Sequence, residues 1–165
     1  MTEKRVCEVI AKMVGDEAVS VVKLLKGKEN VSEFLVAKKL NEDIQVIRNI
    51  LYRLHSLNLA TYKRVKDRQK GWYIGYWTFN ILRARELYAQ LMQMQIERFE
   101  QRLKEEQQYL NNYYICKNVC VRMNFDEAAD LQFHCPECGT LLDHQHNERT
   151  IEVLQEKIKE ISTHS

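Results

Sequence analysis

Four cysteines in two close pairs constrain this chain more than any other feature. Three residues separate Cys116 from Cys120, two separate Cys135 from Cys138, and fourteen lie between the pairs. Pairs with this spacing form two knuckles that close a tetrahedron of thiolates around one zinc ion. The sequence therefore predicts a zinc ribbon near the C-terminus. About thirty residues cannot bury a sufficient core, so we expect metal binding and folding of the ribbon to be one event.

The donor set also indicates what the metal does. Four cysteines saturate a zinc ion, whereas a catalytic zinc keeps an open position and usually has histidine or carboxylate ligands. We therefore expect one structural Zn²⁺ and no enzymatic activity: a zinc hydrolase would need an open site, and a ubiquitin-ligase-like ring would need eight ligands. Replacement of a cysteine by a nearby histidine and unliganded cysteines are the alternatives. The histidines in question are His134, His144 and His146.

The odd number of cysteines and the lack of long apolar segments predict a soluble, intracellular chain. The five cysteines are an odd number, and Cys7 is the one outside the cluster. The N-terminus has no apolar core of the kind found in a secretory signal, and no stretch reaches the roughly 20 apolar residues that span a bilayer. A reducing compartment favours metal over disulfides. We expect a cytoplasmic, nucleoid-associated protein with no membrane partner.

The first 79 residues read as helices followed by a hairpin. Gly15, Gly27 and Asn41 divide helical patterns, and Asp16 and Ser32 stand where a side chain can cap the next helix. The β-rich LATYKRV, the polar KDRQKG and the aromatic WYIGYWTF then predict two strands around a tip. A helix-turn-helix followed by a hairpin is a winged helix. The expected helices cover about 3–14, 16–27, 32–40 and 42–54.

Residues 80–112 contain no glycine or proline and predict one long linker helix. Its apolar stripe favours coiled-coil pairing or packing on a partner, or else packing on the chain's own domains. The stripe consists of Leu82, Ala89, Met92, Ile96, Phe99, Leu103 and Leu110, and Arg85 and Glu106 interrupt it. The predicted fold is thus mostly α with small β parts: a winged helix (1–79), a linker helix (80–112), a zinc ribbon (113–147) and a short amphipathic helix (148–165).

The distribution of charge restricts nucleic-acid contact to one region. Lysine plus arginine exceed aspartate plus glutamate by only 25 to 23, so the chain has no global cationic field. The hairpin tip is locally basic, and next to it stand aromatic residues that could stack on bases. The candidate nucleic-acid residues are Lys63, Arg64, Lys66, Arg68, Lys70, Trp72 and Tyr73. Alternatively, Trp77 and Phe79 are core and the lysines form a solvated tip.

The helix over 42–54 is a poor reader of base sequence. Glu42 and Asp43 open it, and their charge would repel phosphates where a base-reading helix usually carries arginine or asparagine. We expect Arg48 and Arg53 to be solvated or ion-paired surface residues. A sequence-specific winged-helix repressor with a structural zinc site is the alternative function, and it would require a dimer and a base-reading helix.

The order of these segments resembles the alpha subunit of archaeal transcription factor E, the counterpart of the general factor TFIIE. The resemblance covers nearly the whole chain, and the lack of a long acidic C-terminal tail favours the archaeal type. Its most specific parts are Tyr113-Tyr114 before the first knuckle, the segment 125–128, and Cys135-Pro-Glu-Cys138-Gly139. The first pair departs from the commonest ribbon spacing by one extra residue and has no glycine.

The resemblance implies a basal transcription initiation factor. Such a factor joins RNA polymerase, TATA-binding protein and transcription factor B, and it promotes promoter opening without reading the sequence. The resemblance places the winged helix on the polymerase clamp, with the wing near the melted non-template strand, and the ribbon toward the polymerase stalk. A beta subunit is a possible further partner.

Overall fold

The structure is a computed structural model that describes residues 2–66, 71 and 73–164. The chain divides into two compact units, Met1–Leu91 and Met92–Ser165, and each is described by itself. The long helix α5 (Ile81–Gln108) contributes to both. The finer division at residues 79, 112 and 147 stays a prediction.

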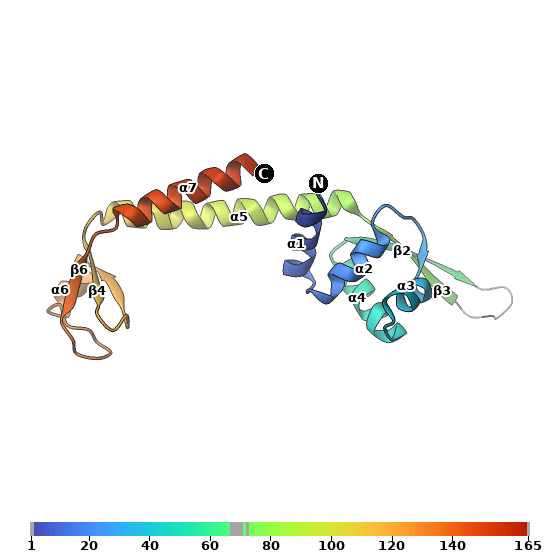
Figure 1. The fold of residues 1–165 in the computed structure, drawn as a ribbon, viewed down its shortest axis with the longest axis horizontal. Helices are drawn as coiled ribbons and strands as arrows, with labels where there is room; N and C mark the ends of the chain where they lie inside the picture. The colour runs from blue at the N-terminus through green and yellow to red at the C-terminus, as the bar shows by residue number, and fades with distance from the viewer. Residues whose placement is uncertain (1, 67–70, 72, 165) are drawn as a thin grey trace. The chain divides into compact units, whose positions relative to one another are not determined.

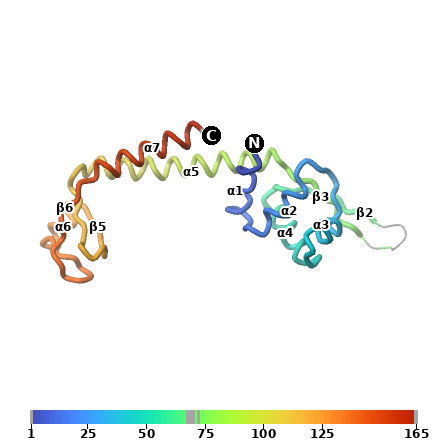
Figure 2. The backbone as a smooth tube through the Cα atoms, viewed as in Figure 1, coloured from blue at the N-terminus to red at the C-terminus, as the bar shows by residue number. Residues whose placement is uncertain are grey.

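The first unit has the elements of a winged helix (Figures 1 and 2). Its three strands form an antiparallel sheet in the order β1-β3-β2, and the hairpin of β2 and β3 pairs Ala60 with Phe79 and Lys66 with Tyr73. The predicted helix-turn-helix and hairpin are confirmed. The elements are α1 (Glu3–Met13), α2 (Glu17–Leu25), β1 (Val31–Ser32), α3 (Glu33–Leu40), α4 (Ile44–Ser56), β2 (Ala60–Lys66) and β3 (Tyr73–Phe79).

One apolar core holds this unit together. Ile10 of α1, Leu25 of α2 and Leu51 of α4 are fully buried in it, because the apolar residues of each helix recur on one face. Trp77 of β3 is also fully buried and Phe79 is 8% exposed, so both are core residues. Two of the aromatics next to the wing therefore support the fold.

Two helix caps differ from the prediction. Asp16 and Ser32 precede α2 and α3, but neither side chain accepts a capping hydrogen bond. Asp16 already has a helical backbone, and Ser32 is held in β1 by pairing with Tyr76 of β3. Asp43 does cap α4: its carboxylate accepts a 2.7 Å hydrogen bond from the Gln45 N–H. Tertiary pairing, rather than the local cap signal, sets the start of α3.

The second unit contains a three-stranded antiparallel sheet in the order β5-β4-β6. Asn124 and Glu127 form a capping box at the start of α6, which explains the FDEA segment between the cysteine pairs. Figures 1 and 2 draw α7 along the second half of α5, and the Lys157 ammonium of α7 lies over the Phe99 ring of α5. The elements are β4 (Tyr113–Cys116), β5 (Arg122–Asn124), α6 (Phe125–Asp130), β6 (Leu142–Gln145) and α7 (Glu148–His164). Within the described residues, no helix has the length and apolar character needed to cross a membrane.

The predicted stripe of α5 is only partly right. Leu82 and Ala89 are exposed, and Ala84 and Leu87 are buried instead, because α5 presents a different face to the core of the first unit. In the second unit the stripe from 92 to 103 is buried or half-buried beside α7, with the Lys157 ammonium 5.8 Å from the centre of the Phe99 ring. This stretch packs within the chain.

Glu106, which interrupts the stripe, is 2% exposed. Its carboxylate accepts two 2.9 Å hydrogen bonds from the Arg122 guanidinium of β5 and a 2.7 Å bond from the Asn147 amide. Burial by itself would raise the pKa of Glu106, but these hydrogen bonds outweigh it and hold that pKa below its ordinary value. Glu106 therefore links the linker helix to the ribbon through these hydrogen bonds.

Candidate metal centre and nucleic-acid interface

The ribbon brings the four predicted cysteines to one point. Cys116 ends β4, Cys120 lies in the turn before β5, and Cys135 and Cys138 flank the turn before β6. Their Sγ atoms all lie within 4.8 Å of one another. Thiolates bound tetrahedrally to one zinc would be about 3.8 Å apart, so a small closure of the group completes the geometry. The group can hold a metal ion.

The two knuckles differ in backbone conformation. In the second, Gly139 has φ +69° and its N–H donates a 2.8 Å hydrogen bond to the Cys135 carbonyl. In the first, Val119 takes φ +56°, a left-handed conformation that β-branched residues rarely adopt. The Asn118 N–H donates to Cys116 Sγ at 3.4 Å. The knuckle without a glycine is thus closed at the expense of backbone strain.

The thiols strongly influence one another. The neighbouring sulfurs of Cys138 and Cys116, together with desolvation, raise the pKa of Cys120 to about 12. Hydrogen bonds from the Thr140 hydroxyl and N–H and from the Asn118 side chain lower the pKa of Cys138 to about 6. Only some of the four can be thiolates without a compensating charge, because adjacent thiolates repel one another. A divalent cation at the centre supplies that charge.

The three nearby histidines make contacts away from the cysteine group. His144 Nε2 lies 2.6 Å from the Asn111 carbonyl oxygen, and His134 Nδ1 lies 2.7 Å from the Gln132 carbonyl oxygen. The His146 ring packs edge-on against His144. Among the described residues, the close group of possible metal ligands contains the four cysteines and no histidine.

The structure describes four of the seven predicted wing residues. Lys63, Arg64 and Lys66 are exposed on β2, and Tyr73 is 50% exposed at the start of β3. The Arg64 guanidinium lies 4.3 Å from the centre of the Tyr73 ring, in a cation–π contact. Cationic and aromatic side chains therefore meet on this hairpin. The other three candidates, Arg68, Lys70 and Trp72, lie outside the described residues.

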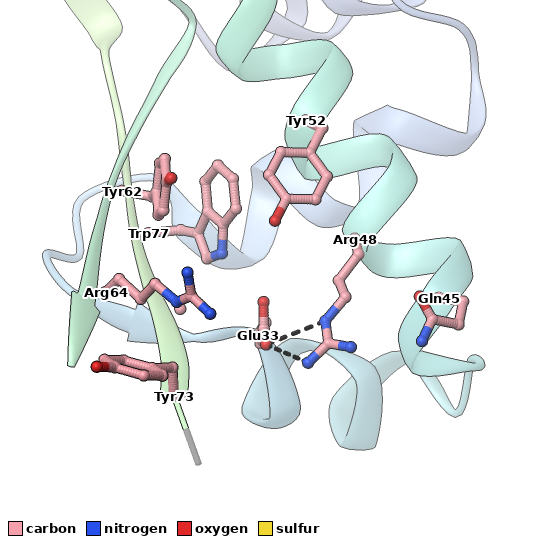
Figure 3. Close-up of a pocket in the computed structure, with 9 residues that line it drawn as sticks. Glu33, Gln45, Arg48, Tyr52, Tyr62, Arg64, Tyr73 and Trp77 are labelled. Atoms are coloured by element: carbon pink, nitrogen blue, oxygen red, sulfur yellow. Dashed lines mark hydrogen bonds and ion pairs between the residues drawn. The ribbon is translucent and has the colours of Figure 1, made fainter. Parts of the chain in front are cut away.

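A pocket of about 400 Å³ opens between this hairpin and α4 (Figure 3). Its floor contains Glu33, which is 4% exposed and accepts two hydrogen bonds from Arg48, from Nε at 3.1 Å and from Nη2 at 2.7 Å. Hydrogen bonding to Glu33 raises the pKa of Arg48 above its ordinary value. The lining residues are Glu33, Gln45, Arg48, Tyr52, Tyr62, Arg64, Tyr73, Gly75 and Trp77.

Sequence reasoning missed this pocket, although Gly75 gives a signal for it. An isolated glycine inside a strand often marks a close approach of another group. A Cβ at Gly75 would lie 2.8 Å from Glu33 Oε2 and 3.1 Å from Trp77 Nε1. The absence of a side chain at Gly75 therefore keeps open a space that both of these polar groups border.

The arginines of α4 are committed to ion pairs, as predicted. Arg48 pairs with Glu33, and Arg53 pairs with Glu17 at 2.6 Å. The carboxylate of Asp43 is used as the helix cap. Both arginines of α4 thus have their charge neutralised by carboxylates of the same unit, which disfavours their use in reading bases.

Fold and site together define the class: a winged-helix protein with a four-cysteine ribbon suited to a metal ion. The family model of the TFIIE alpha subunit matches residues 4–112. The chain belongs to this family, which is one of transcription factors and not of enzymes.

Relatives named Transcription factor E match most of the chain. The one from Pyrococcus abyssi is 35% identical over 96% of this chain and 83% of its own length. The one from Sulfurisphaera tokodaii is 32% identical over 96% and 89%. A solved structure, a possible transcriptional regulator from Methanosarcina mazei, superposes with a TM-score of 0.51 at 17% identity over 59% of this chain and 85% of that one. That likeness concerns the fold alone.

Proposed function

We propose that this chain is a basal transcription initiation factor that binds RNA polymerase in the pre-initiation complex and promotes or stabilises promoter opening. Membership of the TFIIE alpha family carries the proposal. The paired arginines of α4 agree with it, because a factor recruited through protein contacts needs no base-reading helix. Its place of action is the cytoplasm, at the nucleoid.

The metal is one Zn²⁺, bound by Cys116, Cys120, Cys135 and Cys138. The all-thiolate donor set favours zinc in a closed site over a hard, oxygen-preferring cation. When bound, the ion neutralises the thiolates and fixes the two knuckles. The ribbon is a docking module, and no reaction takes place at its metal.

The partners are those of the family resemblance. The winged helix (1–79) docks on the polymerase clamp and the ribbon (113–147) toward the stalk, joined by the linker helix (80–112), with residues 148–165 forming the last segment. TATA-binding protein and transcription factor B complete the assembly.

The wing favours the unpaired non-template strand over the duplex. Its cations attract phosphates, and Trp72 and Tyr73, the two residues directly after Gly71, are the stacking residues. A factor that binds the open complex better than the closed one shifts that equilibrium by its differential affinity. One or two stacked bases, worth about 1–3 kcal/mol each, shift it about fivefold or more. The cations are Lys63, Arg64, Lys66, Arg68 and Lys70.

The first experiment is a pull-down with RNA polymerase, followed by a promoter-opening assay. We expect polymerase binding without promoter specificity. A Trp72→Ala, Tyr73→Ala variant should still bind polymerase and yield about tenfold less open complex. A Lys38→Ala, Lys39→Ala variant, which removes charge from α3, is the control. Unchanged opening by the wing variant would refute the wing mechanism, and tight sequence-selective duplex binding by the isolated chain would indicate a repressor.

A further inference from the structure

The floor of the pocket between α4 and the hairpin contains polar groups that the fold leaves unused. Trp77 is fully buried, yet its Nε1–H has no hydrogen-bond partner among the described residues. Glu33 accepts both Arg48 hydrogen bonds on Oε1, and its Oε2 faces the bare α-carbon of Gly75. An unpaired buried donor costs free energy comparable to a lost hydrogen bond. A buried donor and an acceptor thus lie together at the base of an open pocket.

The walls above this floor are aromatic. Tyr62 stacks on Trp77 with ring centres 5.0 Å apart and planes 25° apart, and Tyr52 meets Trp77 edge-on at 5.6 Å. Figure 3 shows the Tyr52 hydroxyl and the Arg64 guanidinium directed toward the same space. A flat ring with polar edges matches such a cavity, because rings gain from aromatic contact while their edges need hydrogen bonds.

The charges of the lining residues restrict the class of ligand that the pocket can bind. Arg48 and Arg64 line the pocket with one carboxylate, Glu33, so a cationic side chain would meet a net positive charge. A bare phosphate would be repelled by Glu33 at the floor. A neutral ring at the floor joined to an anionic group near Arg64 satisfies both conditions. This is the layout of a nucleotide.

We propose that this pocket binds one unpaired nucleobase of single-stranded DNA, with Glu33 Oε2 accepting from the base edge and Trp77 Nε1 donating to it. Its phosphate then faces Arg64 and the cations of β2. Each base carries donors beside acceptors on its edges, so the pocket captures a base without strict sequence preference. The inference rests on the proposed role of the wing in binding the melted strand, and it adds a specific base site to that role.

The test compares binding of the full zinc-loaded chain to two fluorescent single strands of equal length, one intact and one with abasic sites throughout. Gly75→Ala places a methyl group between Glu33 and Trp77 without changing any charge, and Trp77→Phe removes the donor. Val65→Ala, an exposed wing residue that does not line this pocket, is the matched control. Fluorescence anisotropy at low salt gives the affinities.

We expect Gly75→Ala to weaken binding of the intact strand about tenfold and to leave abasic binding unchanged, as expected for the loss of about one stacked base. Trp77→Phe should act in the same direction, and Val65→Ala should bind like the wild type. The proposal is overturned if the wild type binds the abasic strand as tightly as the intact one. Equal weakening on both strands by folded Gly75→Ala also overturns it, as does no weakening on either.

The results distinguish failure of the base site from failure of the proposed function. If the pocket variants bind like the wild type but promoter opening still depends on Trp72 and Tyr73, only the base site is wrong. If neither the wild type nor any variant binds single-stranded DNA, both the wing mechanism and the base site are refuted. Should Gly75→Ala not fold, Trp77→Phe and the wild-type comparison of strands decide the matter.

Discussion

At the scale of single residues, the two zinc knuckles show how one side chain determines local strain. Gly139 occupies φ +69° at no steric cost, whereas Val119 occupies φ +56° with a branched Cβ. Val119 is 77% exposed, so packing does not compensate for the strain. The metal must therefore supply more of the free energy that closes the first knuckle.

Val119→Gly should stabilise the ribbon. Removing the side chain relieves a left-handed strain of about 1–2 kcal/mol and adds about 0.5–1 kcal/mol of backbone entropy cost, so we expect a net gain of roughly 0.5–1 kcal/mol. Competition with a zinc chelator measures it as tighter metal retention. Val119→Ala, which keeps a Cβ, should gain less. A variant that loses zinc more readily than the wild type would show that the conformation is not strained.

At the scale of elements, the Glu106 network joins α5 to the ribbon. Arg122 of β5 donates to Glu106 with both terminal nitrogens, packs 3.6 Å from the centre of the Tyr113 ring, and bonds Gln145 of β6 at 2.6 Å. A bidentate, partly buried pair of this kind fixes orientation as well as distance. Glu106, the residue that interrupts the apolar stripe, therefore fixes the position of α5 relative to the sheet of the ribbon.

Glu106→Ala should destabilise the second unit by about 2 kcal/mol. The change removes the carboxylate that accepts from both terminal nitrogens of Arg122, and it removes one of the two acceptors of the fully buried Asn147 amide, which keeps its 2.9 Å bond to the backbone carbonyl of residue 106. The partial exposure of Arg122 reduces the penalty below that of a fully buried pair. Thermal or denaturant unfolding of the zinc-loaded chain measures the change. Glu100→Ala, at an exposed position of the same helix, is the control. A loss no larger than that of the control would contradict the structural role of Glu106.

At the scale of the whole molecule, two units are stabilised in different ways. The first has a contiguous apolar core of helices and strands. The ribbon core is small: Cys116, Cys135, Ala128 and Leu142 are its buried members. Such a core offsets little conformational entropy without a metal.

Removal of zinc should therefore unfold the ribbon and leave the winged helix folded. After chelation, amide hydrogen exchange should rise through residues 113–145 while the amides of α2 and α4 keep their protection. Metal analysis should find one zinc per chain. Retained protection throughout the ribbon after complete metal loss would show that its apolar contacts suffice.

The nearly neutral net charge of +2 implies that salt-dependent binding of single strands comes from the wing. Lys63→Ala, Lys66→Ala should lower the slope of log affinity against log salt by about 1.4, since each phosphate contact on a single strand contributes about 0.7. Lys38→Ala, Lys39→Ala on α3 should leave the slope unchanged. Equal slopes for wild type and wing variant would place the phosphate contacts elsewhere.

Much of the fold could be predicted because its signals are local. Asn41 and Gly27 take positive φ where the pattern required helices to end, and the hairpin of β2 and β3 lies where two β-rich runs enclose a polar tip. The predicted caps at Asp16 and Ser32 and the predicted burial of Leu82 were wrong. Strand pairing fixes Ser32 and core packing selects another face of α5, whereas Asp16 itself has a helical backbone.

The sequence by itself determined the order of elements, the grouping of the four cysteines and the family, because spacing and periodicity along the chain carry that information. Only the tertiary structure decided which polar groups meet. Glu33 and Arg48 are fifteen residues apart, and Glu106 and Asn147 forty-one, so no pattern along the chain links them. Their contacts arise when burial forces each buried charge or amide to find a partner, and that partner is set by three-dimensional packing.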